Sequence, residues 1–324
     1  MLESKNNWKA WLYLAPALVL LGIFTFYPLF NAFYLSFLKD YNPMIKPEGG
    51  YSFTLYNYVY ALTLGSGTSD MSLWQGFLNS KFLEGLRNVA IIAVVSVPLS
   101  IVISLLIAVA LNSIKKLRGL FQTIFFLPYV TNSIAVGMAF AIMFSYTSRV
   151  GRAQGLINYF IEFFGGKAIN WVGKGAETWA TMTALLIYTV WGSLAFKIIV
   201  FLSGLQGIDK QYYDAAKIDG TSKRRILWRI TVPLLSPTIL YISITSFIGA
   251  FKTYSSVVGL LGKDMGESAI GKPIITIVGL VYDNIEYTEI GALSRAAAIS
   301  VLLFVIILIF TAIQGLITKK KVHY

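Results

Sequence analysis

Apolar residues along this chain gather in long runs that are separated by shorter polar segments. A helix that crosses a membrane needs about 20 mostly apolar residues. Six runs are long enough, approximately at residues 11–37, 89–111, 123–146, 179–203, 238–260 and 296–316. Pro16 and Pro28 lie inside the first run, which membrane helices tolerate. The pattern predicts an all-α, polytopic membrane protein with six transmembrane helices.

Lys5 and Lys9 precede the first run, an arrangement that also occurs in secretory signal peptides. The apolar stretch is longer than the core of a signal peptide, and no site of small residues suited to cleavage follows it. We therefore expect residues 11–37 to remain as a membrane span.

The composition changes this picture little: 56% of the residues are hydrophobic and 13% are charged. Charged residues make up about 25% of ordinary soluble domains, so that class is excluded. The chain has no cysteine, which excludes disulfides and thiolate metal sites. A net charge of +12 is compatible with nucleic-acid binding in a soluble protein. Here the basic residues lie at the ends of apolar runs, so we expect membrane lipid and no nucleic acid as a partner.

The basic residues lie mainly in alternate loops, and this asymmetry predicts the orientation. If residues 1–10 are cytoplasmic, the segments on that side hold fourteen basic and four acidic residues. The segments on the other side hold ten basic and eleven acidic residues. Because cytoplasmic loops carry the excess of Lys and Arg, we expect the N-terminal segment 1–10 and the basic C-terminal tail 319–324 in the cytoplasm.

Residues 212–237 form the longest polar interruption in the second half of the chain. Good helix formers predict a short helix over 212–219, and Gly220 can take the left-handed conformation that ends a helix. A second short helix is expected to follow and to stop at Pro233 and Pro237. A compact basic segment between two spans can serve as a docking surface on the cytoplasmic side.

The residues DAAKIDG, followed at fixed distance by Ile230 and Pro233, resemble the loop signature of ABC importer permeases. Asp214 stands for the usual Glu of that signature, Thr221 for the usual Ala and Leu227 for the usual Phe. The stretch LAPALVLLGIFTFYPLFNAFYLSF resembles the first span of carbohydrate-type permeases. FLSGLQGID resembles the approach to their loop, and GAFKTY and SRAAAISVLLFVIILIFT resemble their last two spans.

This resemblance implies a type I ABC importer permease with the MetI-like fold, similar to subunits of the maltose and multiple-sugar systems. Residues 11–318 would form the transmembrane domain and residues 204–237 its cytoplasmic coupling loop. The implied location is the bacterial cytoplasmic membrane. The implied partners are a second permease subunit, an ABC ATPase dimer that binds ATP and Mg²⁺, an extracytoplasmic solute-binding protein and a sugar substrate.

The resemblance also implies which residues couple the chain to the ATPase. They are Asp214, Ala215, Ala216, Asp219, Gly220, Arg224, Arg225 and Pro233. The small side chains would allow close packing of the loop helix in a cleft of the ATPase. Arg224 and Arg225 can pair with acidic residues there. That they are only basic residues at the membrane edge remains the alternative.

In maltose-type permeases, sugar contacts come from the spans on either side of the loop. Thr189, Ser193 and Lys197 follow one another at a spacing of four and share a helix face. The substrate-binding residues that we expect on these two spans are Tyr188, Thr189, Trp191, Ser193, Lys197, Lys252, Thr253 and Tyr254. The alternative is that the Ser and Thr residues serve helix packing, as they often do in membranes.

Other chemistry is scarce. The chain has no P-loop motif, its one histidine is His323, and no acidic residue lies inside a predicted span. We therefore expect no catalytic residue, no metal site and no cofactor in this chain, and a transport subunit rather than an enzyme. A channel or a secondary transporter of a small polar solute is the alternative, although proton-coupled transport normally needs ionisable groups inside spans.

Lys197 and Lys252 lie in predicted spans that contain no acidic residue. A lysine inside a membrane costs about 2.5–3.5 kcal/mol on insertion scales. An ammonium group that faces a water-filled path can meet an anion, so we predict a saccharide with an acidic group such as a uronate. The alternative is a neutral oligosaccharide with both lysines reaching for the membrane surface.

Overall fold

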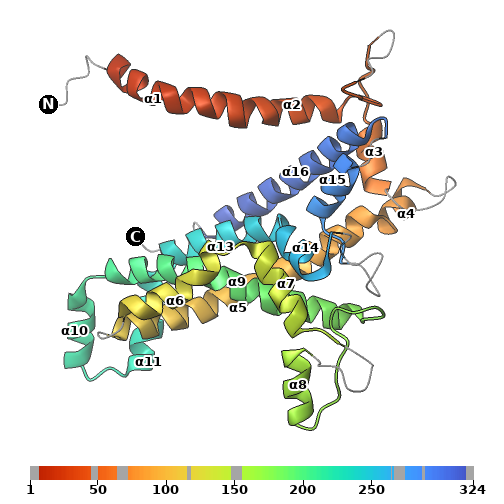
Figure 1. Cartoon of the computed structure of the whole chain (residues 1–324). Coiled ribbons are helices and arrows are strands. Elements are labelled where there is room, and N and C mark those ends of the chain that lie inside the picture. The colour runs from red at the N-terminus through yellow and green to blue at the C-terminus, as the bar shows by residue number, and fades with distance from the viewer. Residues whose placement is uncertain are drawn as a thin grey trace. The chain divides into compact units, whose positions relative to one another are not determined.

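The computed structural model describes residues 7–44, 50–63, 72–114, 118–146, 155–263, 265, 274–286 and 289–318. Within these ranges the chain is helical, with one isolated bridge between Leu38 and Phe53 and no strand. Figure 1 shows this arrangement of helices. The predicted all-α class is confirmed. The predicted tail 319–324 lies outside the described residues.

Four helices are long and apolar enough to cross a membrane: Trp8–Ser36, Lys81–Ser113, Thr178–Gln206 and Ala292–Leu316. Two bent pairs of helices also qualify, Gly119–Val130 with Ser133–Met143 and Lys223–Leu234 with Ser236–Phe251. If each bent pair is counted as one span, the described residues hold six spans, in agreement with the hydropathy pattern.

The third predicted span, 123–146, is not one straight helix. It is divided into α6 (Arg118–Val130) and α7 (Ser133–Met143), and the two are bent by 97°. The side chain of Asn132 accepts hydrogen bonds from the backbone N–H groups of Ile134 (2.8 Å) and Ala135 (3.4 Å). An Asn that caps a helix in this way favours the start of a new helix over continuation of the preceding one.

The fifth predicted span, 238–260, is also interrupted. Helix α13 (Ser236–Phe251) ends with Lys252 in the capping position, and α14 (Ser255–Leu261) follows Tyr254. Tyr254 has φ −144° and ψ −59°, outside the helical range. Lys252 therefore lies at a helix end and not inside a span.

Pro233 does not stop the second helix of the coupling loop, contrary to the prediction. Helix α11 (Lys223–Ile226) runs through a π-helical turn (Leu227–Thr231) into α12 (Val232–Leu234), which contains the proline. A proline clashes with the carbonyl group four residues earlier, and the wider π turn just before it relieves that crowding. The first span repeats this arrangement, because the π turn Gly22–Phe26 directly precedes the helix that holds Pro28.

The chain forms two compact units. The first comprises Met1–Leu83 and Leu280–Val305. Its helices are α1 (Asn7–Leu21), α2 (Tyr27–Ser36), α3 (Tyr56–Thr63), α4 (Leu73–Leu78), most of α15 (Ile277–Glu286) and the first half of α16 (Ala292–Thr318). Arg295 pairs with Glu289 at 3.0 Å and lies over the ring of Tyr60, so the positive charge of this arginine is balanced within the unit.

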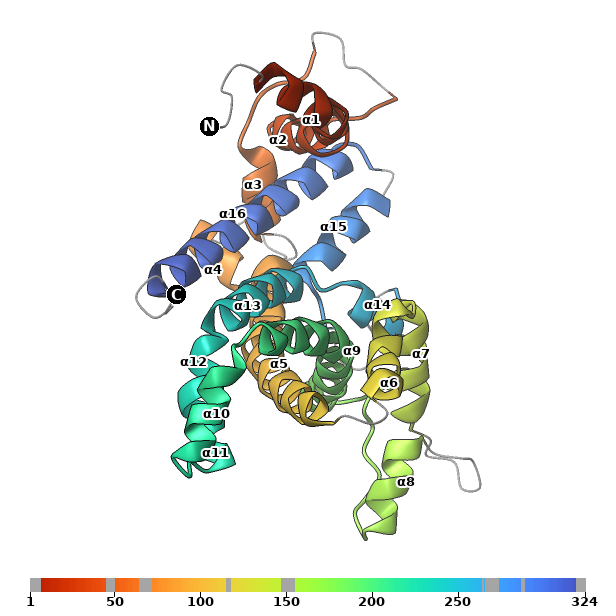
Figure 2. The ribbon, with the colours of Figure 1, turned by 90° about the vertical axis from the view of Figure 1, so that its left-hand side faces the viewer.

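The second unit comprises Glu84–Gly279 and Ile306–Tyr324. It is built around α5 (Lys81–Ser113) and α9 (Thr178–Gln206), which Figure 2 shows nearly end-on. Ile198, Phe201 and Leu202 of α9 pack with α5 and α13 in one buried apolar cluster. Leu185 and Tyr188 of α9 belong to a second cluster that includes residues of α14. Helix α9 is therefore the element on which the bent spans pack.

The crossing of α7 and α14 is close because both helices present a glycine there. A Cβ atom placed on Gly137 would lie 2.6 Å from the carbonyl carbon of Gly259. Real Cβ atoms do not approach backbone so closely, so this packing requires glycine at position 137.

Candidate functional site

A cavity of about 440 Å³ lies in the second unit between α5, α6, α7, α9, α13 and the start of α14. Its polar lining is made of hydroxyl groups and one ammonium group, from Ser96, Ser133, Thr189, Ser193, Lys197, Thr245, Ser246, Thr253 and Ser256. Four aromatic side chains join them: Tyr129, Tyr188, Trp191 and Phe196. We call this the central cavity.

The structure brings six of the eight expected substrate-binding residues together at the central cavity. They are Tyr188, Thr189, Trp191, Ser193, Lys197 and Thr253. Lys252 and Tyr254 are not among its lining residues. Lys252 is exposed, because it follows the last turn of α13 and its neighbour Thr253 points the other way, into the protein.

Lys197 is the buried charge of the cavity, with 4% of its surface exposed. Its ammonium group donates hydrogen bonds to Oγ of Ser100 on α5 (2.5 Å) and to Oγ of Ser193 on α9 (3.1 Å). No residue that lines this cavity in the described part of the chain is acidic. An ammonium group has three donors, so the two serines leave one for another acceptor. The head group lies beside Ser193, one turn earlier on α9, at the cavity, and does not reach toward the end of α9 at Gln206.

Two further residues of α9 shape the cavity. The Tyr188 hydroxyl donates to the backbone carbonyl of Ser133, the first residue of α7, and so joins α9 to the start of the bent half of the third span. The Thr189 hydroxyl is buried and has no hydrogen-bond partner among the described residues. A hydroxyl left in this way is available to a ligand.

The part of the cavity that α6 and α7 contribute was not expected from the sequence. Tyr129 and Ser133 lie on either side of the bend in the third span, and Tyr129 stacks on Phe196 with ring centroids 5.9 Å apart. The polar residues Thr131 and Asn132 within an apolar run were the available signal, because a capping Asn marks a helix start.

The coupling loop contains the predicted helix, α10, over Lys210–Ile218. The side chain of Asp209 caps it by accepting from the N–H of Gln211 at 3.0 Å. At the other end Gly220 has φ +66°, which confirms the predicted left-handed conformation. The N–H groups of Gly220 and Thr221 donate to the carbonyls of Lys217 (3.0 Å) and Ala216 (2.9 Å). This Schellman motif fixes where α10 ends.

The two small residues of α10, both expected to pack in a cleft of the ATPase, differ in their exposure. Ala216 is buried against the rest of the loop, whereas Ala215 is exposed. Tyr212 (54% exposed) and Ile218 (87% exposed) present apolar surface that the sequence analysis overlooked. The feature of the sequence that could have indicated this surface is the position of these two large apolar residues in a mainly polar helix.

The remaining expected coupling residues are polar and lie at the surface, except for Pro233, which is half-buried. Arg224 and Arg225 are exposed at the start of α11. Asp214 pairs with Lys217 on the same helix at 2.8 Å. The hydrogen bond from Lys217, together with its charge, lowers the pKa of Asp214. This carboxylate therefore stays ionised to lower pH than a free one.

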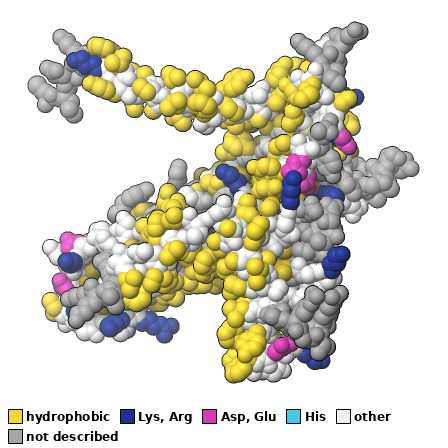
Figure 3. Space-filling model, viewed as in Figure 1, with side chains coloured by type: hydrophobic (Ala, Val, Ile, Leu, Met, Phe, Trp, Pro, Cys, Tyr) yellow, Lys and Arg dark blue, Asp and Glu magenta, His cyan; other side chains and the backbone are white. Residues whose placement is uncertain are grey.

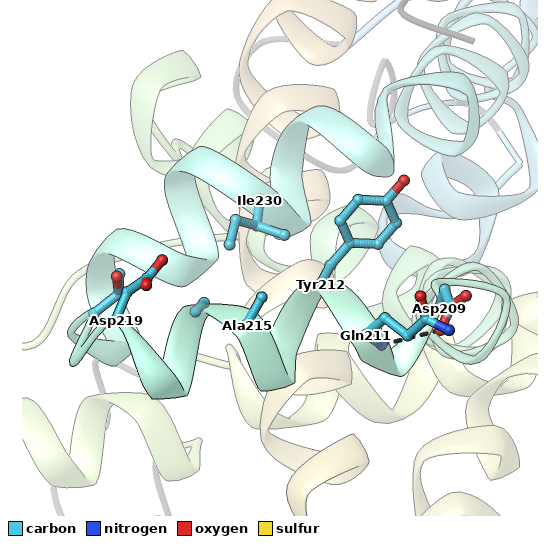
Figure 4. Close-up of a pocket in the computed structure, with 8 residues that line it drawn as sticks. Asp209, Gln211, Tyr212, Ala215, Asp219 and Ile230 are labelled. Carbon is cyan, nitrogen blue, oxygen red and sulfur yellow. Dashed lines mark hydrogen bonds between the residues drawn. The ribbon is translucent and has the colours of Figure 1, made fainter.

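A hollow of about 470 Å³ separates α10 from the π turn behind it. Figure 4 shows Tyr212, Ala215 and Ile230 along the hollow, with Asp209 toward one end and Asp219 toward the other. The two carboxylates thus mark the ends of a groove in the loop whose lining is both polar and apolar.

Comparisons with known proteins find relatives along nearly the whole chain. Residues 71–323 match the family described as binding-protein-dependent transport system inner membrane component. The chain is 29% identical to the lactose transport system permease protein of Rhizobium radiobacter, over 97% of this chain and 95% of the relative. It is 30% identical to an arabinooligosaccharide transport system permease protein of Halalkalibacterium halodurans, over 79% of this chain and 77% of the relative.

Among solved structures, a bacterial ABC transporter that imports the acidic polysaccharide alginate has a chain of similar fold. The TM-score is 0.71, with 17% sequence identity, and the match covers 98% of this chain and 96% of the other. At that identity the similarity describes the fold.

Proposed function

Because this chain belongs to the family of binding-protein-dependent transport inner membrane components and is the multi-pass permease subunit of a sugar ABC importer, we propose that the central cavity is its part of the sugar pathway. The observation that carries the proposal is the lining of the cavity. Hydroxyl groups and aromatic rings converge there from six helices, although their surroundings are apolar. Sugars are bound by hydrogen bonds to their hydroxyls and by aromatic rings that lie against them.

The coupling loop would transmit ATP-driven movement to the cavity. Helix α10 begins four residues after the end of α9, which supplies Thr189, Ser193 and Lys197 to the lining. A rigid shift of α10 on an ATPase surface would therefore act directly on the helix that holds the cavity together. In this proposal ATP and Mg²⁺ are bound by the ATPase pair, and Ile218 and Tyr212 add apolar contact to the coupling residues expected from the sequence.

The remaining partners follow from the family and from the location of the cavity. A second permease subunit would complete the pathway, and an extracytoplasmic solute-binding protein would deliver the sugar. This arrangement requires α10 and both chain termini on the cytoplasmic side, as the distribution of basic residues predicts.

We further propose that the transported saccharide carries an acidic group. Lys197 supports this because its ammonium group is buried, faces the cavity and is held by two neutral serines. Ser133 at the start of α7 lines the same cavity, and a helix N-terminus also favours negative charge. Lys252 does not contribute, since it lies outside the lining.

The proposal is tested with the complete importer in proteoliposomes and its solute-binding protein. The binding protein is titrated with a neutral disaccharide and with the matching uronate, and each loaded form is then added to measure stimulation of ATP hydrolysis. Stimulation by the uronate-loaded form at lower sugar concentration supports an acidic substrate. Stimulation by the neutral sugar alone leaves a sugar importer but rejects the acidic group. No stimulation by any saccharide rejects the sugar pathway itself.

A further inference from the structure

We propose that α8 (Leu156–Phe163) lies in the plane of the membrane and places its aromatic face in the interface of the outer leaflet. Five large apolar side chains form this face: Leu156, Tyr159, Phe160, Phe163 and Phe164. They recur at intervals of three and four residues, so they share one side of the helix. Each is between 49% and 82% exposed. We call this the aromatic face.

The opposite side of α8 is fixed to the protein, so the aromatic face cannot turn inward. Ile157 and Ile161 pack against the buried cluster of the second unit. Asn158 is fully buried between them. Its side chain donates to the carbonyls of Ser145 (3.1 Å) and Ile169 (3.0 Å). It also accepts from the N–H of Ile169 (3.0 Å) and from the indole of Trp171 (3.1 Å).

The same contacts place α8 level with the end of a membrane span. Trp171, which Asn158 holds, contacts Trp179 in the first turn of α9 with ring centroids 6.1 Å apart. Trp179 is 54% exposed at the end of that span, the position where aromatic side chains mark the membrane surface. Asn158 thus ties the depth of α8 to the end of α9.

The direction of α8 matches a helix that lies along a membrane. Figures 1 and 2 both show α8 running across the direction of α5 and α9. If those two helices cross the bilayer, α8 is parallel to its surface. Figure 3 shows hydrophobic side chains on one side of the α8 region and acidic and basic side chains on another. Amphipathic helices with this division lie with their apolar side in the headgroup and acyl boundary.

A lipid surface fits the chemistry of this face better than water or a protein groove. Its rings contact one another, Tyr159 with Phe160 and Phe163 with Phe164, and in the described part of the chain they have no ring contact with another element. Tyr and Phe next to a span are removed from water by the bilayer itself, with no partner required. The anchored helix would then hold the link between α7 and α9 at the membrane surface while the span that α6 and α7 form moves.

The test uses spin labels in the complete importer. Single cysteines replace Phe160, Phe163 or Glu162 in this cysteine-free chain, with cysteine-free partner subunits, and the complex is placed in nanodiscs of phosphatidylcholine and phosphatidylglycerol. Collisions with oxygen, which concentrates in lipid, and with a water-soluble nickel chelate are measured. The matched control is Glu162, an exposed residue of the same helix outside the aromatic face.

At Phe160→Cys and Phe163→Cys we expect the oxygen-to-nickel ratio to exceed that of Glu162→Cys several-fold. High access to both reagents at 160 and 163 would mean a face in water and would overturn the proposal. Low access to both would mean that a protein covers the face and would also overturn it. If both reagents reach positions 160 and 163 in the importer alone, and neither does after the solute-binding protein is added, that protein and not lipid is the occupant.

Discussion

Gly220 is a residue whose backbone conformation, and not the space around it, limits what can replace it. Its φ is +66°, and a Cβ atom added there would meet nothing within 4 Å. The sequence predicted this correctly, because a glycine after a short helix is the usual left-handed stop. The coupling role given to the loop residues remains a prediction.

We predict that Gly220→Val abolishes saccharide-stimulated ATP hydrolysis although the complex still assembles. A β-branched residue at positive φ is strained by about 1–3 kcal/mol, which would unwind the end of α10. Gly220→Asn is the matched control, since Asn tolerates this conformation and should keep most of the stimulation. Normal stimulation in Gly220→Val would contradict the assigned role.

We predict that Thr189→Val weakens sugar uptake without lowering the stability of the complex. Because its buried hydroxyl has no partner among the described residues, Thr189→Val should leave the thermal stability of the complex unchanged or slightly raised. The sugar concentration for half-maximal uptake should rise by the equivalent of about 0.5–1.5 kcal/mol if the hydroxyl binds substrate. Reduced stability with unchanged uptake would instead assign Thr189 to packing.

For single residues, the sequence predicts correctly which side chains share one face of a regular helix. Thr189, Ser193 and Lys197 do share a face of α9 and line one cavity. It was less informative at Lys252, where an unforeseen helix end turned the side chain to the surface. It also could not separate Ala215 from Ala216, because exposure within the loop depends on how the π turn packs against α10.

At the scale of elements, hydropathy located the spans but missed their breaks. An apolar run looks the same whether its helix is straight or bent, so 123–146 and 238–260 were each read as one helix. At the first break the side chain of Asn132 provides the alternative hydrogen bond, whereas at the second the backbone of Tyr254 leaves the helical range with no side-chain cap. Both breaks border the central cavity, which is where a discontinuous membrane helix is expected to bind a solute.

We predict that one methyl group added at the crossing of α7 and α14 lowers the stability of the protein. Gly137→Ala forces the helices apart, since its Cβ would lie 2.6 Å from the backbone of Gly259, and overpacking of this kind costs about 1–3 kcal/mol. We expect a lower midpoint of thermal unfolding in detergent. Gly119→Ala in α6, where a Cβ meets nothing within 4 Å, should leave the midpoint unchanged or raise it. Equal midpoints for the two variants would contradict the close crossing.

For the whole molecule, the family and the six spans follow from the sequence, but the orientation in the membrane rests on charge alone. We predict that single cysteines at Ser66 and Ser222 label from opposite sides. Ser66 lies outside the described residues, in a predicted outer loop, and Ser222 precedes α11. An impermeant thiol reagent added to intact cells should reach position 66 only. Labelling at position 222 alone would invert the model.

We propose that Lys197 meets an anionic group of the sugar in the central cavity, so the uptake of an acidic sugar should depend on this side chain. Complete importers with wild-type, Lys197→Gln or Lys252→Gln permease are placed in proteoliposomes with saturating binding protein, and ATP-dependent uptake of a labelled uronate disaccharide is followed. We predict that Lys197→Gln raises the sugar concentration for half-maximal uptake by the equivalent of about 1.5–3 kcal/mol, because a hydrogen bond to a charged group is lost. Lys252→Gln should behave as wild type. Uptake that is unaffected by Lys197→Gln, or that is reduced only by Lys252→Gln, would contradict the claim.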